Sequence, residues 1–523
     1  MRVINSARNA AAGMVQWGIQ MALNFIVRTV FIHTLSEGYL GIGGLLSSIL
    51  TVLSLADLGV SSAVTYALYK PMAEKNIEKV KSLLWYFRRV YRIIGFVFFG
   101  LGLAVMPFLP YLAKGATDLV NLRFVFLLYL LEISTSYWFF GYLSILPATD
   151  QRDYKLAPTR YAASIMSGVI RIVLLLVLRG VPAVSYYVYT SFGIVSSLLV
   201  NLLIRHKVMK LYPWARDLTA PPLPDEEKQA LRKNMVGVTT NKVCAILNDG
   251  IDSTIVSALI GVAANGIFSN YLFIRTYLNK LLSLLFSGMH ASIGELCAVE
   301  SREKKESFFR SLQLMYFWIY GFCAICLWTL YDAFIIGVWL HDPKWKISGI
   351  AVFLLGFNFL IEGIAGAVVK YRDVHGMYWQ TKYRYMVSSV LNAVLSVILV
   401  GPAKLGVAGA LLGTMVSLVI MLSFDPVLVY REVFGKKAWA FYRMYFGYLA
   451  LALATAALVY ILSRPFAAYT VMNFIWRLLI CLVVPNGLWY ILFRKRPEAQ
   501  YLWNSARYVL DKFFKRSRGI PQK

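Results

Sequence analysis

The chain has 523 residues, of which 59% are hydrophobic and only 15% are charged, and its formal net charge is +27. An ordinary soluble domain is about a quarter charged and under half apolar, so this composition excludes a soluble globular enzyme. The composition also argues against a nucleic-acid binder, because the basic residues have almost no soluble surface from which to contact phosphates. Apolar runs of about 20 residues follow one another, each long enough to cross a bilayer as a helix. The sequence therefore predicts an all-α polytopic membrane protein.

Fourteen membrane-spanning helices are predicted. They occupy residues 11–33, 41–69, 84–111, 120–147, 158–179, 184–204, 234–260, 264–289, 308–338, 347–369, 380–400, 405–429, 442–463 and 468–493. With a cytoplasmic N-terminus, the segments facing the cytoplasm hold 40 of the 53 Lys and Arg, the opposite segments hold six, and the spans hold seven. Since cytoplasmic loops are enriched in Lys and Arg, we expect both termini in the cytoplasm. Orientation then accounts for most of the net charge.

The longest connection, residues 205–233, divides the chain into two similar halves and is expected to be a basic linker with an interfacial helix. At an offset of about 224 residues, polar positions recur in the second half: Asn24 and Asn248, Arg28 and Asp252, Arg160 and Arg384, Ser164 and Ser388. Six spans per half is an even number, so the halves insert the same way round and form a parallel pseudo-two-fold repeat. We expect six-helix bundles at 1–204 and 234–430, with helices 13 and 14 and a basic tail at 431–523.

Polar side chains inside the spans carry the functional signal, because they are costly in lipid and normally face protein or water. In the first span, Gln16, Gln20, Asn24 and Arg28 recur every four residues and so share one helix face. Glu132 and Arg171 are two further charges in the first half, for which a structural ion pair and a role in the cavity are both open.

The sign of these charges indicates an anionic substrate. Arg offers a planar fork of donors to phosphate oxygens and keeps its charge when desolvated. The candidate substrate-binding residues are Arg28, Arg275, Lys280, Gln20, Asn24 and Asp57. Asp252 and Arg28, opposite in charge and related by the repeat, are candidates for a gate. Carboxylates and amides at Asn248, Asp249 and Asp252 are candidates for coupling to Na⁺ or H⁺. The sequence contains no GxxxxGK[ST] loop for ATP, and it indicates neither a cofactor nor a firm metal site.

The pattern resembles that of a known family. Fourteen spans, two six-span halves, the run Leu-Ala-Asp-Leu-Gly at 55–59 in span 2 and the basic loop after it are similar to the Wzx-type polysaccharide flippases. These belong to the multidrug/oligosaccharidyl-lipid/polysaccharide (MOP) superfamily. The resemblance implies alternating access that moves an undecaprenyl-pyrophosphate-linked oligosaccharide across the bacterial inner membrane, from the cytoplasmic to the outer leaflet.

The resemblance also carries expectations for individual residues and partners. Lipid II flippases of the superfamily use arginines of their first and eighth helices, where Arg28 and Arg275 stand here. Some have a sodium site on helices 7, 11 and 12, where this chain has Asp249 or Asp252, Asn392 and Thr414. The expected partners are the lipid-linked glycan, membrane lipids and the glycan polymerase machinery, and the chain is expected to act as a monomer without nucleic acid.

Three alternatives remain beside this interpretation. A lipid II-type flippase and a multidrug or cation antiporter belong to the same superfamily. Drug-extruding relatives usually have twelve spans and an acidic residue in the first helix, where this chain has Arg28, which disfavours a cationic drug. A membrane glycosyltransferase or polymerase needs carboxylates on a large outer loop, and the predicted outward loops are only about four to eight residues long. The chain is therefore expected not to be an enzyme.

Overall fold

The computed structural model describes residues 2–54, 60–116, 118–217, 219, 221–229, 231, 251–287, 293, 296–297, 300–375, 377–505 and 507. Within these ranges the regular structure is helical, without strands, which confirms the predicted all-α fold. The chain folds into two compact units. The first comprises Met1–Leu278 with Val400–Pro402, and the second comprises Asn279–Leu399 with Ala403–Lys523. The expected bundle boundary at 205–233 stays a prediction, because residues 232–250, which follow it, lie outside the described ranges.

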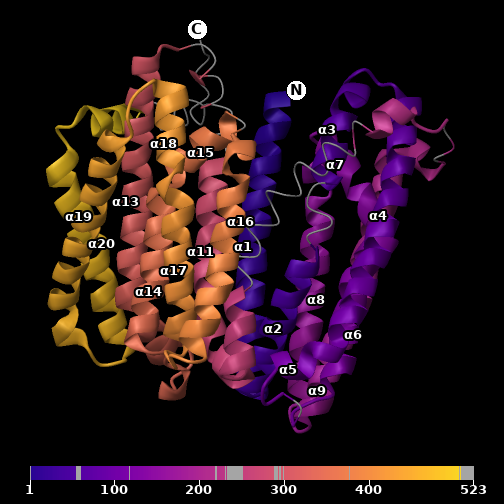
Figure 1. Ribbon diagram of the computed structural model, residues 1–523. Coiled ribbons are helices and arrows are strands. Elements are labelled where there is room, and N and C mark those ends of the chain that lie inside the picture. Colours follow the sequence, from indigo (N-terminus) through magenta and orange to yellow (C-terminus); the bar gives the residue numbers. More distant parts are fainter. Residues whose placement is uncertain are drawn as a thin grey trace, which may run out of the picture. The chain divides into compact units, whose positions relative to one another are not determined.

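Helices labelled in Figure 1 make up most of the first unit. They are α1 (Arg2–Thr34), α2 (Glu37–Leu53), α3 (Val60–Ala73), α4 (Ile77–Val105), α5 (Leu109–Leu112), α6 (Leu122–Trp138), α7 (Ile145–Thr149), α8 (Ala157–Val177), α9 (Pro182–Leu211) and the first part of α11 (Val262–Ser287). The helix α1 packs along α8, α8 packs on α9, and α9 packs on α6, which in turn contacts α4. Fully buried side chains such as Leu45, Leu84, Phe98 and Phe126 form the apolar core of this unit.

The second unit is organised around one long helix, α13 (Arg302–Phe334). The other helices are α14 (Gly349–Ile364), α15 (Gly366–Val374), α16 (Tyr378–Val400), α17 (Val407–Ser423), α18 (Asp425–Val429), α19 (Trp439–Ser463) and α20 (Val471–Phe493). The helices α14, α19 and α20 all pack against α13, and α17 packs against α14. The indole of buried Trp489 on α20 donates to the Thr455 hydroxyl on α19 at 3.0 Å, so the last two helices are fixed to each other as well as to α13.

The helices correspond closely to the predicted spans. Nine helices in the described part of the chain are long and apolar enough to cross a membrane, and two bent pairs raise the number to eleven. These pairs are α6 with residues 141–149, bent by 56°, and α14 with α15, bent by 41°. Three predicted spans remain: α2 with α3, where 55–59 are not described, the span at 234–260, which is mostly undescribed, and α11, which carries two basic residues. Most of each predicted span is thus helical where the chain is described, and the predicted span 120–147 is interrupted by a turn at residues 139–140.

Side-chain caps explain where several helices begin. The first turn of a helix leaves backbone N–H groups without a partner, and a Ser, Thr or Asn side chain at the N-cap accepts one of them. Five N-caps of this kind are Asn76 before α4, Asn121 before α6, Ser301 before α13, Ser348 before α14 and Thr470 before α20. These caps lie between the apolar runs, so they separate one span from the next.

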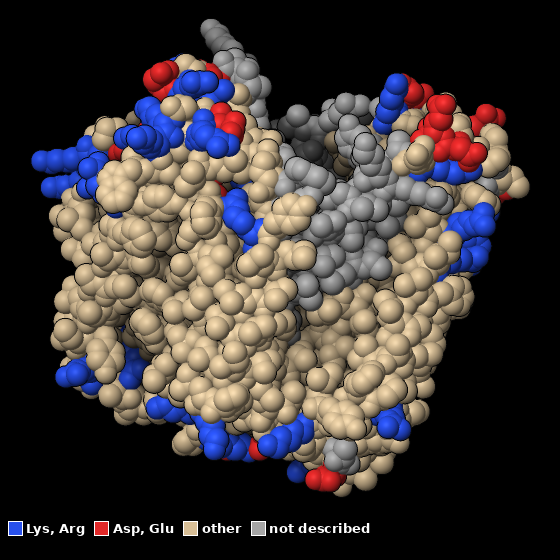
Figure 2. Space-filling view, viewed as in Figure 1, with Lys and Arg blue, Asp and Glu red and all other residues tan. Residues whose placement is uncertain are grey.

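Charged side chains gather at the two ends of the helices. On the face shown in Figure 2, Lys, Arg, Asp and Glu cluster at the top and bottom of the view, and the wide zone between them is largely uncharged. Large apolar side chains such as Phe96, Val177, Val387 and Ile491 are exposed on the helices. In water this exposure would be costly, whereas in hydrocarbon it is not. The distribution agrees with a multi-pass membrane protein.

One helix crossing in the first unit depends on two glycines. A Cβ atom on Gly41 of α2 would lie 1.6 Å from the Val262 carbonyl oxygen of α11, and one on Gly266 would lie 2.0 Å from the Glu37 carbonyl oxygen. The Asn265 side-chain amide donates to the Gly41 carbonyl at 3.1 Å in the same crossing. Small residues allow backbones to approach this closely, as is common between membrane helices.

Gly41→Ala is expected to lower the stability of the protein by about 3 kcal/mol, because the added methyl group meets backbone atoms that cannot move aside easily. Thermal unfolding in detergent would measure the change. Gly100→Ala on α4 is the matched control, since nothing lies within 4 Å of its added Cβ and Ala favours a helix over Gly. Equal melting temperatures for the two variants would contradict the close crossing.

Candidate functional site

The first unit contains a polar cavity of about 650 Å³ between its helices. Residues from α1, α2, α6, α8, α9 and the beginning of α11 line it. Its polar and aromatic lining residues are Gln16, Gln20, Asn24, Arg28, Phe31, Tyr39, Ser47, Tyr129, Arg160, Ser164, Ser167, Arg171, Tyr186, Tyr189, Ser196, Ser269 and Phe273. A pocket of this size with a few convergent polar groups is the usual form of a ligand site.

The polar face predicted for the first span lines this cavity. Gln16, Gln20, Asn24 and Arg28 all contribute to its wall. Ser164 on α8 donates to the Gln20 side-chain oxygen at 3.1 Å, the Gln20 amide donates to Asn24 at 3.1 Å, and Asn24 donates to the Tyr277 hydroxyl. The chain of hydrogen bonds joins α1 to α8 and α11, and it holds neutral polar groups along the cavity next to Arg28.

Arg28 is bound only by neutral groups among the described residues. Its Nε donates to the Asn270 side-chain oxygen at 2.9 Å, and its Nη2 donates to the Ser269 hydroxyl at 2.6 Å. The guanidinium also lies 4.8 Å from the centre of the Phe273 ring. Asp252 is buried, and its predicted pairing with Arg28 as a gate stays a prediction. The amide, the hydroxyl and the ring orient the guanidinium without neutralising its charge.

Two other arginines of the cavity do have carboxylate partners. Arg160 makes a bidentate pair with Asp153, with distances of 2.7 and 3.0 Å. Arg171 approaches Glu132 less closely, at 3.4 Å. Asp and Glu are absent from the described residues that line the cavity itself, so its wall carries positive charge only. Such a wall attracts anions and repels cations.

The structure separates the other predicted anion-binding residues from this wall. Arg275 and Lys280 lie on α11 but do not line the cavity, Arg275 is half-buried, and Lys280 is exposed and belongs to the second unit. On α11 the lining residues are instead Ser269 and Phe273. Asp57, Asn248 and Asp249 lie outside the described residues, so their predicted roles stay predictions.

Two of the predicted ion-coupling residues are in contact within the second unit. The Thr414 hydroxyl of α17 donates to the Asn392 side-chain oxygen of α16 at 3.4 Å, and the Ser396 hydroxyl donates to the same oxygen at 3.1 Å. Asn392 and Thr414 are both buried. The described residues contain no group of three or more His, Cys, Asp or Glu arranged to hold a metal ion. A coupling role for Asn392 and Thr414 stays a prediction.

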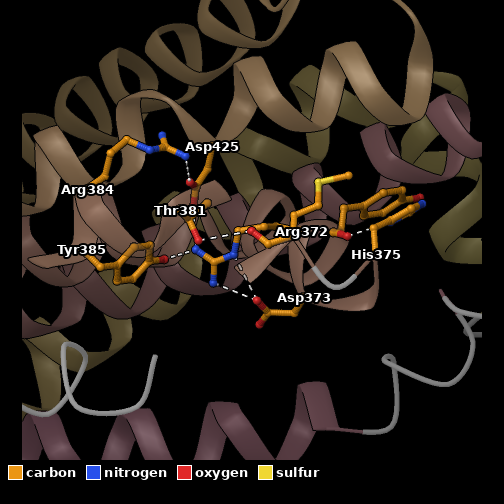
Figure 3. Close-up of polar contacts among 9 residues, drawn as sticks. Arg372, Asp373, His375, Thr381, Arg384, Tyr385 and Asp425 are labelled. Atoms are coloured by element: carbon orange, nitrogen blue, oxygen red, sulfur yellow. Dashed lines mark hydrogen bonds and ion pairs between the residues drawn. The ribbon is translucent and has the colours of Figure 1, made fainter. Parts of the chain in front are cut away.

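A buried charge cluster in the second unit was not predicted from the sequence (Figure 3). The Asp425 side chain at the start of α18 is 1% exposed and accepts from Arg372 of α15 at 2.7 Å, while Arg384 of α16 lies 3.2 Å away. Arg372 also pairs with Asp373 at 2.8 Å and donates to the Tyr385 hydroxyl. The cluster joins three helices, so its first role is to hold α15, α16 and α18 together.

Sequence reasoning also missed most of the cavity wall outside α1. The serines of α8 and α9 and the tyrosines of α6 and α9 line it. Ser164 and Ser167 lie three residues apart on α8, with Arg171 four residues further, and this spacing places them on one face. That spacing was the available signal, although Ser164 and Arg171 were singled out separately and were not joined into one face. The tyrosines gave no such signal, because the chain has 33 of them.

Sequence comparisons find no match to this chain, whereas structural comparisons find solved structures with a similar fold. No family model matches the chain, and no curated protein matches it. An inward-facing multidrug-resistance MATE transporter of the MOP superfamily has a TM-score of 0.61 at 12% identity, over 80% of this chain and 98% of its own. The lipid II flippase MurJ, in an inward closed conformation, has a TM-score of 0.65 at 12% identity, over 92% of this chain and 98% of its own.

A third solved structure with a similar fold is notable for the polarity of its binding pocket. It is a MOP superfamily transporter from Pyrococcus furiosus described as having a binding pocket of reverse polarity, and it matches with a TM-score of 0.55 at 13% identity over 82% of this chain and 96% of its own. At these identities the similarity is one of fold, and a fold alone does not define a substrate. The chain has the fold of MOP superfamily transporters.

Proposed function

We propose that this protein is a secondary transporter that flips a pyrophosphate-linked oligosaccharide lipid across the bacterial inner membrane by alternating access. The cargo would be an undecaprenyl-pyrophosphate-linked repeat unit of a surface polysaccharide. Both termini would face the cytoplasm, as the distribution of Lys and Arg predicts. A Na⁺ or H⁺ gradient would drive the cycle, and the partners would be the lipid-linked glycan, the surrounding lipids and the glycan polymerase machinery.

The single observation that carries this proposal is the environment of Arg28. A guanidinium that lines a cavity and contacts only an amide, a hydroxyl and an aromatic ring keeps its full positive charge for a ligand. In a site with few water molecules, an unneutralised charge is costly unless an opposite charge arrives. Phosphate oxygens match the geometry of its donors. The cavity is therefore suited to a phosphorylated cargo.

The neutral part of the cavity suits the sugar portion of the same cargo. Gln16, Gln20 and Asn24 follow Arg28 toward the N-terminus at one-turn intervals, which places about 18 Å of amide-bearing wall beside the charge. Ser167 and Ser196, whose hydroxyls are 2.8 Å apart, face the same cavity from α8 and α9. Amides and hydroxyls both donate and accept hydrogen bonds, as sugar hydroxyls require.

The extent of the structural matches supports a lipid-linked cargo. The MurJ structure covers 92% of the chain and the MATE structure 80%, a difference of about 63 residues. The pair α19 and α20 has a similar length, from Trp439 to Phe493. These two helices, beyond the twelve of drug-extruding transporters, would suit a groove for a long isoprenoid tail.

Two alternatives use the same fold. A lipid II-type flippase would carry a related pyrophosphate-linked sugar lipid and is favoured by the same Arg28 environment. A multidrug or cation antiporter requires negative charge in its site, and the described lining of this cavity has none. A membrane glycosyltransferase is the least favoured, because its chemistry needs catalytic carboxylates, and the described cavity wall has none to offer.

Deletion of the gene tests the proposal in the native cell. We expect loss of a surface glycan and accumulation of its lipid-linked precursor in the inner leaflet, both restored by the wild-type protein. Precursor leaflet position can be measured by its accessibility to a hydrolase that cannot cross the membrane. An intact surface glycan together with a new sensitivity to cationic dyes would instead identify a multidrug antiporter.

A further inference from the structure

Arg171 of α8 uses only a small part of its hydrogen-bonding capacity. Its Nη1 lies 3.4 Å from the Tyr189 hydroxyl and its Nη2 lies 3.4 Å from Glu132 Oε1, both long for a charged pair. Its Nε is buried without a hydrogen-bond partner. Arg160, on the same helix, makes two shorter bonds, a bidentate contact with Asp153 at 2.7 and 3.0 Å. Arg171 therefore lines the cavity with two long contacts and one unused donor.

The packing of α1 against α8 brings Arg171 to the level of Arg28. Ser164 of α8 bonds Gln20 of α1, and a Cβ on Gly168 would meet the Leu23 side chain at 3.1 Å. If α1 and α8 keep this register for three more residues, Arg171 of α8 lies beside positions 26 to 28 of α1. The Arg171 guanidinium is 5.0 Å from the centre of the Tyr189 ring, and Tyr189 lines the same cavity as Arg28.

Glu132 of α6 occupies one side of the Arg171 guanidinium. Its carboxylate rests on Gly193 of α9, where a Cβ would lie only 2.4 Å from Glu132 Oε2. The side chain of Glu132 is 28% exposed and that of Arg171 is 25% exposed. The carboxylate is thus held in place beside Arg171 by its packing against Gly193. Because the ion pair is long, at 3.4 Å, another anion can compete with Glu132 for Arg171.

We infer that Arg171 is a second ligand for the phosphate groups of the cargo and that Glu132 is an internal competitor for it. The inference rests on the proposed function and adds a source of specificity to it. An anion that enters the cavity binds Arg171 only if it displaces a carboxylate of charge −1. Displacement of the carboxylate costs the same free energy for every anion, so it lowers all affinities by one factor. Because Coulomb energy grows with the charge of the ligand, a pyrophosphate still binds after this cost, whereas the monoanionic headgroup of an ordinary phospholipid binds too weakly to do so. Glu132 would thereby exclude the bulk anionic lipids of the membrane.

Binding to the purified full-length protein in detergent tests the inference. The probes are farnesyl pyrophosphate and a short-chain phosphatidylglycerol, with affinities measured by isothermal titration calorimetry. Glu132→Gln, which keeps the shape of the side chain, is expected to raise the affinities for phosphatidylglycerol and farnesyl pyrophosphate by a similar factor of about tenfold. Arg171→Gln is expected to weaken farnesyl pyrophosphate binding about tenfold, and Arg171→Lys to restore part of the loss.

Two further variants separate the inference from effects on folding. Gly193→Ala leaves both charges in place but displaces the carboxylate, so it should change the affinities in the same direction as Glu132→Gln. In the double variant Glu132→Gln with Arg171→Gln, the gain from Glu132→Gln should disappear. Unchanged affinities in Glu132→Gln, or a gain that survives in the double variant, would overturn the inference.

The same titrations distinguish a failure of the inference from a failure of the proposed function. If Arg28→Gln weakens farnesyl pyrophosphate binding while the Arg171 and Glu132 variants bind as the wild type does, the anionic cavity stands and the competition is wrong. If the wild-type protein binds neither probe, both are wrong.

Discussion

Arg28→Gln is expected to reduce export of the lipid-linked glycan about 100-fold. The substitution keeps a polar side chain on α1 but removes the charge that the neutral partners Asn270 and Ser269 leave unneutralised. A hydrogen bond to a charged group contributes about 1.5–3 kcal/mol, and the upper value corresponds to a factor of about 100 in binding. Surface glycan produced per cell, normalised to the amount of protein in the membrane, measures the effect.

Two controls make this expectation specific to the charge and its position. Arg28→Lys keeps the charge without the planar fork of donors, so it should retain an intermediate activity. Arg123→Gln removes an arginine that is exposed near the start of α6, and export should stay within about twofold of the wild type. Wild-type export by Arg28→Gln would show that the cavity does not bind its cargo through this residue.

Asp425→Ala is expected to destabilise the second unit by about 3–5 kcal/mol, the range observed when one partner of a buried ion pair is removed. Asp425 lies between Arg372 and Arg384, and its loss leaves two guanidinium groups without their shared counter-ion inside the protein (Figure 3). Guanidinium groups do not lose their proton to escape the cost, because arginine keeps its charge in proteins. Thermal unfolding of the purified protein would show the loss.

The exposed pair of Arg431 and Glu432 provides the matched control, since it lies a few residues further along the same segment. Their side chains are 73% and 47% exposed, so Glu432→Ala should change stability by less than about 1 kcal/mol. If Asp425→Ala were as stable as Glu432→Ala, the buried cluster would not hold α15, α16 and α18 together.

The spans could be predicted from the sequence because hydrocarbon imposes one strong rule on the chain. Backbone groups must be satisfied within each segment, so apolar runs of sufficient length become helices. The bend between α6 and residues 141–149 was not predictable in the same way. It follows Phe140, which takes a left-handed conformation with φ of 58°, a choice that no apolar pattern encodes. The break in the predicted span 120–147 therefore depends on tertiary packing.

The cavity wall was predictable only on α1, where polar residues recur at one-turn spacing along a single helix. The residues of α1 from Gln16 to Arg28 recur at one-turn spacing and do line the cavity. On α11 the same reasoning chose Arg275, although the wall is formed by Ser269 and Phe273. Arg275 is two residues beyond Phe273, which turns it about 200° around the helix and away from this wall. The rotation of the helix therefore keeps Arg275 out of this wall, and a substrate-binding role for it stays a prediction.

The buried cluster around Asp425 shows a different limit. Arg372 and Asp425 are 53 residues apart, and Arg384 lies between them in the chain. Asp425 falls within the predicted span 405–429, Arg384 lies near the start of the predicted span 380–400, and Arg372 lies in the connection before it. The sequence explained those arginines by orientation alone. Only the packing of α15, α16 and α18 reveals that two of them neutralise a carboxylate.

Reconstitution of the purified protein in liposomes tests the central claim most directly. The measurement compares the flipping rates of two fluorescent polyprenyl-linked sugars that differ only in their linkage, a pyrophosphate in one and a neutral ether in the other. We expect that the protein flips the pyrophosphate-linked lipid, that it flips the neutral lipid at least about 100-fold more slowly, and that Arg28→Gln reduces the first rate to the second. Equal rates for the two lipids, with or without Arg28, would contradict a cavity built for a phosphorylated cargo.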